Sequence, residues 1–168
     1  VVGPLTDREK LTASIAGSDA VISALGPKLS MKRKVTGLPI AEAHKSIISV
    51  MEEVGCKRFI TLGTPSIRAQ EDTKQLVTVL PGKMAKVMFP TGYAEMKAIE
   101  EIIKSSNLDW TVVRIVNPNV KTNGNGYGIT FGDTKGKMSV SRYNVAKCML
   151  DAVTKDEWIH KMPIVFNI

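Results

Sequence analysis

The segment from Tyr93 to Pro118 constrains the fold most, because it reads as a helix, a short turn and a buried strand. Apolar residues recur at helical spacing between Met96 and Ile103, which gives the helix one apolar face. The stretch Trp110–Val116 is dense in β-branched residues, as expected of a strand that is covered on both faces. An amphipathic helix that leads into such a strand is typical of a parallel sheet covered by helices.

The rest of the chain repeats this alternation of helix and strand. Capping residues and apolar periodicity predict helices over Arg8–Ala16, Pro39–Val54, Tyr93–Ser105 and Ser141–Val153. Short apolar runs predict strands over Ala20–Leu25, Phe59–Leu62, Trp110–Val116 and Met162–Phe166, with Val1 and Val2 as the tail of a further strand. The alternation predicts one α/β domain over residues 1–168, a doubly wound parallel sheet of the Rossmann-like kind.

Two segments depart from this pattern. The apolar, Met-rich stretch Lys74–Met88 is interrupted by Pro81-Gly82, which predicts two short helical pieces or a mobile lid. Later, the run Asn123-Gly124-Asn125-Gly126 predicts a hairpin turn, with Ile129–Phe131 and Met138–Val140 as its two small strands.

Composition narrows the class of protein. The hydrophobic fraction of 43% and charged fraction of 23% are those of a globular domain. Cys56 and Cys148 are the only cysteines, too few for a disulfide framework, so we expect a reducing, cytoplasmic location. No apolar run reaches the ~20 residues of a membrane span, and no signal peptide opens the chain.

The net charge of +7 is partly local, because four cations gather in one loop. They are Lys28, Lys32, Arg33 and Lys34. Such a run either faces solvent or attracts a phosphate-bearing ligand. Nucleic acid is not expected as a partner, because aromatic residues make up only 5% and none interleaves with the cations.

Tyr93 and Lys97 are the candidates for chemistry, because they lie one helical turn apart and can share a face. A phenol, with a pKa near ~10, is a poor acid–base group at neutral pH. An ammonium held beside it favours the phenolate and brings proton transfer into reach. The plainer interpretation is an exposed Tyr and a solvated Lys at the start of an amphipathic helix.

Three stretches of this chain resemble one family. The run Tyr93-x-x-x-Lys97-x-x-x-Glu101, followed by Leu108-Asp-Trp-Thr-Val-Val-Arg114, is similar to the short-chain dehydrogenase/reductase superfamily, and most similar to its atypical, NmrA-like NAD(P)-binding branch. The segments Val2–Asp7 and Gly17–Gly26 resemble the third and fourth strands of that family. The segment Arg142–Ala146 resembles the start of its late helix, so the likeness extends over nearly the whole chain.

The resemblance implies specific roles. Tyr93 would be the proton donor, Lys97 would hold the nicotinamide ribose, and Thr64 would orient the substrate. The usual Ser-Ser position of the family reads Leu62-Gly63 here, so the alternative is that Thr64 and Ser66 only cap a turn. The residues implied for NADP or NAD binding are Ser23, Ala24, Leu25, Gly26, Pro27, Lys97, Asn117 and Pro118. Arg114, within a strand, is expected to anchor a carboxylate structurally.

One part of the family pattern is missing. A G-x-x-G-x-x-G turn, which receives the cofactor pyrophosphate at a helix N-terminus, occurs nowhere in the 168 residues. The resemblance therefore predicts a fold that is N-terminally incomplete, with Ala20–Leu25 as an exposed hydrophobic edge. Such an edge would pair with a second copy as a homodimer, or the sequence is a fragment. We also expect these residues alone to bind NAD(P) weakly or not at all.

Three functions follow from the resemblance. The first is an NAD(P)-dependent oxidoreductase that reduces a carbonyl or related small-molecule substrate. The second is a non-catalytic NmrA-like regulator that senses the dinucleotide. The third is a truncated paralogue without cofactor binding. No metal site is predicted.

Overall fold

A computed structural model gives the fold of residues 1–27, 37–120 and 126–168, which are the residues described below. The helices are α1 (Arg8–Ile15), α2 (Pro39–Val54), α3 (Leu76–Met88), α4 (Pro90–Lys104), α5 (Arg142–Ala152) and the short 3₁₀ helix η1 (Asp156–Trp158). The strands are β1 (Ala20–Ser23), β2 (Arg58–Gly63), β3 (Asp109–Ile115), β4 (Pro118–Asn119), β5 (Tyr127–Thr130), β6 (Val140–Ser141) and β7 (Ile164–Asn167). The cationic run at 28–34 and the turn at 123–125 lie outside the described residues.

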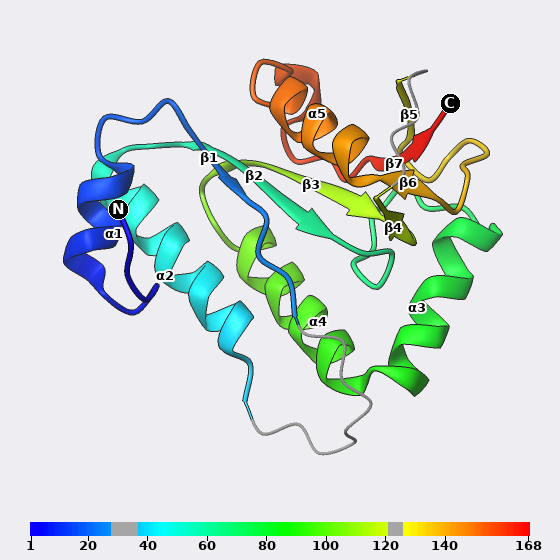
Figure 1. Ribbon diagram of the computed structural model, residues 1–168, viewed down its shortest axis with the longest axis horizontal. Helices are drawn as coiled ribbons and strands as arrows, with labels where there is room; N and C mark the ends of the chain where they lie inside the picture. Colours follow the sequence, from blue (N-terminus) through cyan, green and yellow to red (C-terminus); the bar gives the residue numbers. More distant parts are fainter. Residues whose placement is uncertain (28–36, 121–125) are drawn as a thin grey trace.

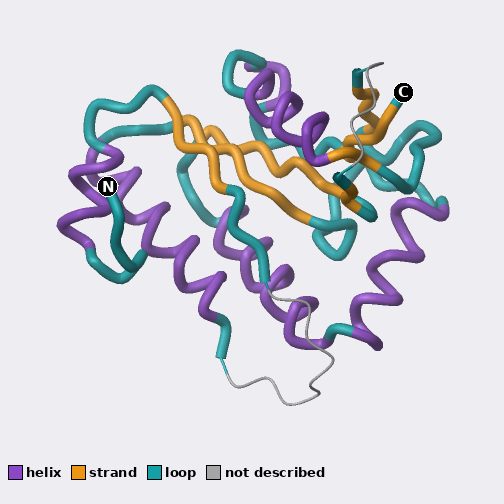
Figure 2. Tube along the Cα trace, viewed as in Figure 1, coloured by secondary structure: helices purple, strands orange, loops and turns teal. Residues whose placement is uncertain are grey.

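The predicted parallel sheet is confirmed. Within the described residues the main sheet has the order β1-β2-β3-β7-β5, and its first four strands are parallel. In the register of β2 and β3, Phe59 lies beside Trp110 and Gly63 beside Arg114. The helix–strand alternation thus predicted correctly that strands far apart in the sequence lie side by side (Figure 2).

Helices cover both faces of the sheet, as a doubly wound fold requires. On one face, Phe59 and Val112 belong to the core beneath α2 and α4. On the other, Ile60 and Val113 pack with Val145 and other residues of α5 (Figure 1). Neighbouring residues of a strand point to opposite faces, so one β-branched run serves two cores.

The strand β1 lies at the edge of the sheet, as predicted, although it ends at Ser23 rather than Leu25. The side of β1 away from β2 has no strand partner among the described residues, and Ile22 is 43% exposed. Val1 and Val2 are exposed and belong to no strand, so the predicted strand tail is wrong.

The predicted hairpin is also wrong in its pairing. Residues close to the two predicted strands do form β5 and β6, but β5 pairs antiparallel with β7, and β6 pairs parallel with β4. Gly128 faces Phe166 across the β5–β7 ladder, and a Cβ there would lie 2.6 Å from the Phe166 ring. This close approach stabilises a long-range pairing that a local turn signal does not show.

Within the interrupted segment Lys74–Met88, one continuous helix, α3 (Leu76–Met88), forms in place of two pieces or a lid. Pro81 lies inside it, where its ring removes one backbone donor. A Cβ at Gly82 would lie 3.3 Å from the carbonyl oxygen of Pro65, so α3 packs closely on the loop after β2 at this point. That packing explains why a sequence with poor intrinsic helix propensity remains helical here.

Local signals predicted the other helices well. The helix α2 begins at Pro39 and ends before Gly55, which adopts the left-handed conformation (φ 77°), both as predicted. The helix α4 begins three residues earlier than predicted, at Pro90, so Tyr93 lies inside its first turn. Arg114 is fully buried and pairs with Asp72 at 2.7 Å, which confirms its structural role.

Candidate functional site

Three loops meet at one edge of the sheet, where the parallel strands end. The residues after Ser23 in β1 lie beside the end of β2, because Ser23 is in register with Thr61. Thr64 follows β2, and Asn117 follows β3, whose Arg114 is in register with Gly63. Loops at the carboxyl ends of parallel strands form the ligand crevice of this architecture. The sheet therefore brings most of the residues predicted for the site to a single edge.

The first turn of α4 reaches the same edge. Gly92 faces Pro27, and a Cβ at Gly92 would lie 3.6 Å from Pro27 Cγ. Tyr93 follows directly, and its backbone N–H donates to the carbonyl of Phe89 at 2.9 Å. The Tyr93 side chain is half-buried. The predicted proton donor thus sits on the turn of α4 that contacts the Gly26-Pro27 loop.

Lys97 does not stand alone on the next turn. Its ammonium donates to Glu100, which also pairs with Lys104 at 2.7 Å. Glu100 further accepts a hydrogen bond from the backbone N–H of Arg68 at 3.3 Å. Burial opposes the ionisation of Glu100, but the hydrogen bonds from Lys104 and Lys97 outweigh it, so the pKa of Glu100 lies below its usual value. Lys97 is thus directed at a carboxylate one turn beyond it, away from the turn of Tyr93.

Thr64 takes part in a turn. Its hydroxyl oxygen accepts from the backbone N–H of Ser66 at 3.3 Å, and its carbonyl accepts from Ile67 at 2.9 Å. This is the turn-capping alternative raised by the sequence. The hydroxyl of Ser66 is buried and has no hydrogen-bond partner among the described residues. Both hydroxyls therefore lie just after the end of β2. That of Thr64 accepts a hydrogen bond, whereas that of Ser66 has no partner among the described residues.

The residues predicted to bind the cofactor lie along this edge. The hydroxyl of Ser23 is buried and accepts from the N–H of Leu25 at 3.4 Å, so it shapes the loop. Ala24 and Gly26 are exposed, whereas Leu25 and Pro27 are half-buried. Asn117 is exposed and has a positive φ of 46°, which few residues other than glycine adopt. Pro118, also exposed, opens β4.

Two buried polar residues lie behind the edge and are not among the residues predicted for the site. Both carboxylate oxygens of Glu95 accept from the N-terminus of α2, from Ile40 N–H at 3.1 Å and Ala41 N–H at 2.8 Å. Glu95 is 1% exposed and lies between Tyr93 and Lys97 in sequence. It therefore joins α4 to the first turn of α2, where a helix leaves N–H groups without partners. A Glu on an apolar helix face was the signal that could have found it.

His44 is the second such residue. One ring nitrogen, Nδ1, donates to the carbonyl of Ile40 at 2.8 Å, and Nε2 accepts from the hydroxyl of Thr61 at 2.9 Å. Burial lowers the pKa of His44, while the Ile40 carbonyl and the charge of Glu95 act in the opposite direction. His44 thus connects α2 to β2 as a neutral ring.

The loop that follows β1 is open at Gly26. Among the described residues, an added Cβ at Gly26 would meet no heavy atom within 4 Å, so these residues leave the backbone of this loop open to a ligand. We predict that the loops at 23–27 and 117–118 contact the ribose and nicotinamide half. The donors that would receive a pyrophosphate are not supplied by a glycine-rich turn in this sequence.

Within the described part of the chain, no helix is both long and apolar enough to cross a membrane.

Comparison with known proteins agrees with this geometry. Residues 1–156 match the family model described as NAD(P)H-binding. A wide-type short-chain dehydrogenase/reductase from Veillonella parvula, solved in complex with NADP, has a TM-score of 0.75 at 16% identity over 99% of this chain and 71% of that chain. An anaerobillin reductase from Escherichia coli has a TM-score of 0.73 at 15% identity over 98% of this chain and 73% of that one.

A third solved structure, a putative NAD-dependent epimerase/dehydratase from Bacillus halodurans, has a TM-score of 0.68 at 21% identity over 100% of this chain and 72% of that one. No curated protein matches the sequence. At such identities the solved structures show the fold alone, a Rossmann-like fold, whereas the family model covers most of the sequence. The chain therefore belongs to the NAD(P)H-binding family.

Proposed function

We propose that the protein is an NAD(P)-dependent oxidoreductase of the NmrA-like branch that reduces a carbonyl or a related small molecule in the cytoplasm. The observation that carries this proposal is the position of Tyr93, on the turn of α4 that contacts the Gly26-Pro27 loop through Gly92. In the proposed reaction, NAD(P)H, when bound, supplies a hydride to the carbonyl carbon. The Tyr93 hydroxyl gives its proton to the carbonyl oxygen, so the product is an alcohol.

The other residues position and assist. Lys97 would leave Glu100 to hold the ribose and to favour the phenolate that forms at Tyr93. Lys104 stays bonded to Glu100 at 2.7 Å, so this carboxylate keeps a cationic partner when Lys97 moves. Thr64, or the hydroxyl of Ser66, which has no partner within the described parts of the chain, would donate to the substrate oxygen at the end of β2.

The test is hydride transfer by the protein with NADPH and NADH against a panel of aldehydes, ketones and imines. We expect turnover that Tyr93→Phe lowers by about 10²-fold or more, the size of one lost proton donor. Tyr143→Phe, which alters an exposed Tyr on α5, is the matched control and is expected to leave the rate unchanged. Turnover that survives Tyr93→Phe in full would exclude Tyr93 as the proton donor.

A second function has one observation in its favour. Lys97 and Thr64, two of the three predicted catalytic residues, are engaged in contacts with Glu100 and Ser66. That arrangement also suits a regulator that binds the dinucleotide without turnover. In that case NAD(P)H would raise the melting temperature at millimolar concentration, and no substrate in the panel would oxidise it. If neither nucleotide raised the melting temperature, both functions would be excluded for these residues.

The exposed edge of β1 supports a further proposal about assembly. The side of β1 that has no strand partner among the described residues, with the 43% exposed Ile22, suits pairing with the β1 strand of a second copy as a homodimer. Sedimentation equilibrium of the wild type and of Ile22→Lys is the measurement. The charged variant is expected to shift the chain to monomer, and an unchanged dimer would place the interface elsewhere.

A further inference from the structure

A cleft of about 700 Å³ lies between α3 and the loop that follows β2. Its apolar wall consists of Leu76, Val79 and Leu80 from the first turns of α3. None of the residues that line it belongs to the strand-end edge that holds Thr64 and Tyr93. The volume is within the range of about 300–1,000 Å³ that small-molecule sites occupy. The cleft is therefore large enough for an organic ligand and separate from the predicted nicotinamide position.

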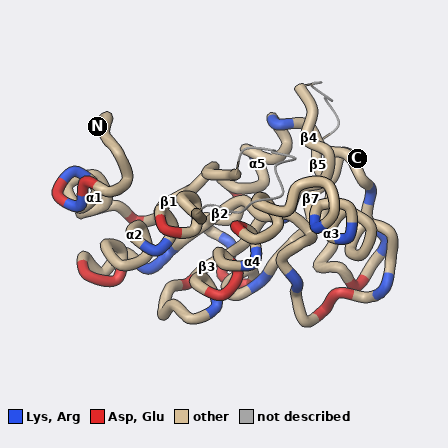
Figure 3. The backbone as a smooth tube through the Cα atoms, turned by 90° about the horizontal axis from the view of Figure 1, so that it is seen from below, with Lys and Arg blue, Asp and Glu red and all other residues tan. Residues whose placement is uncertain are grey.

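The polar part of the cleft has one sign of charge. Arg68, Lys74 and Lys83 line it, and no Asp or Glu does. Within the described residues none of these three cations forms a salt bridge, whereas the nearby Glu71 and Asp72 are each paired with another cation. The helix α3 itself carries no acidic residue (Figure 3). Three uncompensated cations around one cleft favour an anionic ligand.

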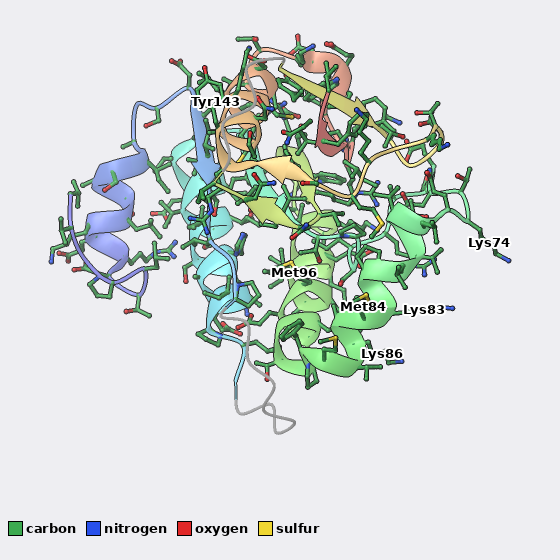
Figure 4. The ribbon with its side chains drawn as sticks, turned by 45° about the vertical axis from the view of Figure 1, so that its right-hand side comes forward. Lys74, Lys83, Met84, Lys86, Met96 and Tyr143 are labelled. Atoms are coloured by element: carbon green, nitrogen blue, oxygen red, sulfur yellow. The ribbon has the colours of Figure 1, made fainter. Side chains whose placement is uncertain are left out.

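The apolar part of the cleft is unusually open to solvent. Leu76 is 72% exposed and Leu80 is 40% exposed. Figure 4 shows Lys74 and Lys83 extending outward from this side of the molecule, beyond the helix that carries the leucines. A ligand seated against the leucines would therefore meet the ammonium groups at the rim. Apolar surface beside uncompensated cations is the complement of an amphipathic anion.

The walls of the cleft are held in place before any ligand binds. The side-chain amide of Gln75 donates to the carbonyls of Gly132 at 2.9 Å and Thr134 at 2.8 Å. On the opposite side, the backbone of Arg68 is held by Glu100 and by Lys104, which donates to the Arg68 carbonyl at 2.9 Å. A cleft with fixed walls loses little entropy when it accepts a ligand.

We propose that this cleft binds a small amphipathic anion, a molecule with an apolar body and a carboxylate group. The apolar body would cover Leu76 and Leu80, and the carboxylate would lie between Arg68 and Lys83. A second copy of the chain is a poorer occupant, because a symmetric interface here would bring like-charged lysines together. The site does not depend on hydride transfer, so it can be tested without turnover.

The probe is 8-anilinonaphthalene-1-sulfonate, an apolar anion whose fluorescence rises on binding. We expect saturable binding to the wild type, displaced by dodecanoate but not by dodecyltrimethylammonium, which has the same chain and the opposite charge. Removing two partly exposed cations in Lys74→Gln/Lys83→Gln should weaken probe binding by about three- to tenfold. Lys86→Gln removes a charge from the same helix outside the cleft, and is expected to keep the affinity within about twofold.

Three results would overturn the proposal. Equal displacement by the cationic detergent would show that charge plays no part. Equal weakening by Lys86→Gln and by the cleft variant would show only a long-range field. Loss of probe binding as the protein concentration rises and the chain self-associates would show that a second copy covers this face. Every substituted lysine is exposed, so each variant is expected to fold, and circular dichroism checks that it does.

Discussion

Replacing Arg114 with Met should destabilise the protein by about 3–5 kcal/mol, the usual cost of leaving one partner of a buried ion pair without the other. The Arg114 side chain is fully buried, and that of its partner Asp72 is 6% exposed. The guanidinium also donates to the carbonyls of Met162 at 2.8 Å, Ile67 at 3.3 Å and Phe131 at 3.4 Å. Met fills a similar volume but leaves Asp72 and these acceptors unsatisfied.

Urea unfolding followed by circular dichroism measures this loss, and thermal unfolding should show a melting temperature lowered by roughly 6–20 °C. Arg142→Met, at the exposed start of α5, is the control and should shift stability by less than about 0.5 kcal/mol. If Arg114→Met fails to fold, Asp72→Asn tests the same pair, and it should lose about 1–3 kcal/mol. A loss below about 1 kcal/mol for Arg114→Met would refute the view that this cation holds the loop before α3.

Three further predictions concern the residues around α4. Glu95→Gln should lower the free energy of unfolding in urea by about 2–4 kcal/mol, because one side-chain N–H₂ would face a backbone N–H of α2, whereas the carboxylate accepts two such hydrogen bonds. An unchanged urea midpoint would contradict this prediction. Burial lowers the pKa of His44, so the stability contributed by the neutral His44 ring is complete above pH 6.5 and is lost as the pH falls, by up to about 1.4 kcal/mol per pH unit. His44→Gln should therefore flatten the dependence of the unfolding free energy on pH between pH 7 and 5. Glu100→Gln should strengthen NAD(P)H binding by about two- to fivefold in a titration if Lys97 holds the cofactor, and should leave it unchanged if it does not.

The sequence predicted the parts of the fold that local chemistry decides. Pro39 favours the first turn of a helix and Gly55 favours the residue after its end, and both predicted the bounds of α2 correctly. Pro81-Gly82 is the same kind of signal, yet α3 continues through it. The reason is the contact between Gly82 and Pro65, which are far apart in sequence. Propensity alone does not contain such a contact.

The same distinction applies to the candidate site. The carboxyl ends of parallel strands had to share an edge, so Ser23, Thr64 and Asn117 could be placed together from the sequence. The direction of the Lys97 side chain could not be predicted from its spacing to Tyr93 alone. Glu100, three residues after Lys97, lies on the opposite side from Tyr93 and binds the same ammonium group. A check of all i, i+3 and i, i+4 pairs on the helix would have identified this competitor. The cleft at α3 needed the tertiary fold, because the spacing of Arg68, in the loop before α3, and Lys83, on the helix, does not show that both line one cleft.

The contact between Lys97 and Glu100 is a small obstacle to cofactor binding. The Lys97 side chain is 40% exposed, and ion pairs of this kind contribute about 0.2–1 kcal/mol, which lowers cofactor affinity by no more than about fivefold. Lys104 and the Arg68 amide remain on Glu100 when Lys97 leaves, so no buried charge is abandoned. Binding of the pyrophosphate affects affinity more, since each charge-assisted hydrogen bond that a glycine-rich turn would give is worth about 1.5–3 kcal/mol. For these 168 residues, we therefore expect the donors available to the pyrophosphate to set the affinity for NAD(P)H far more than the ion pair of Lys97 does.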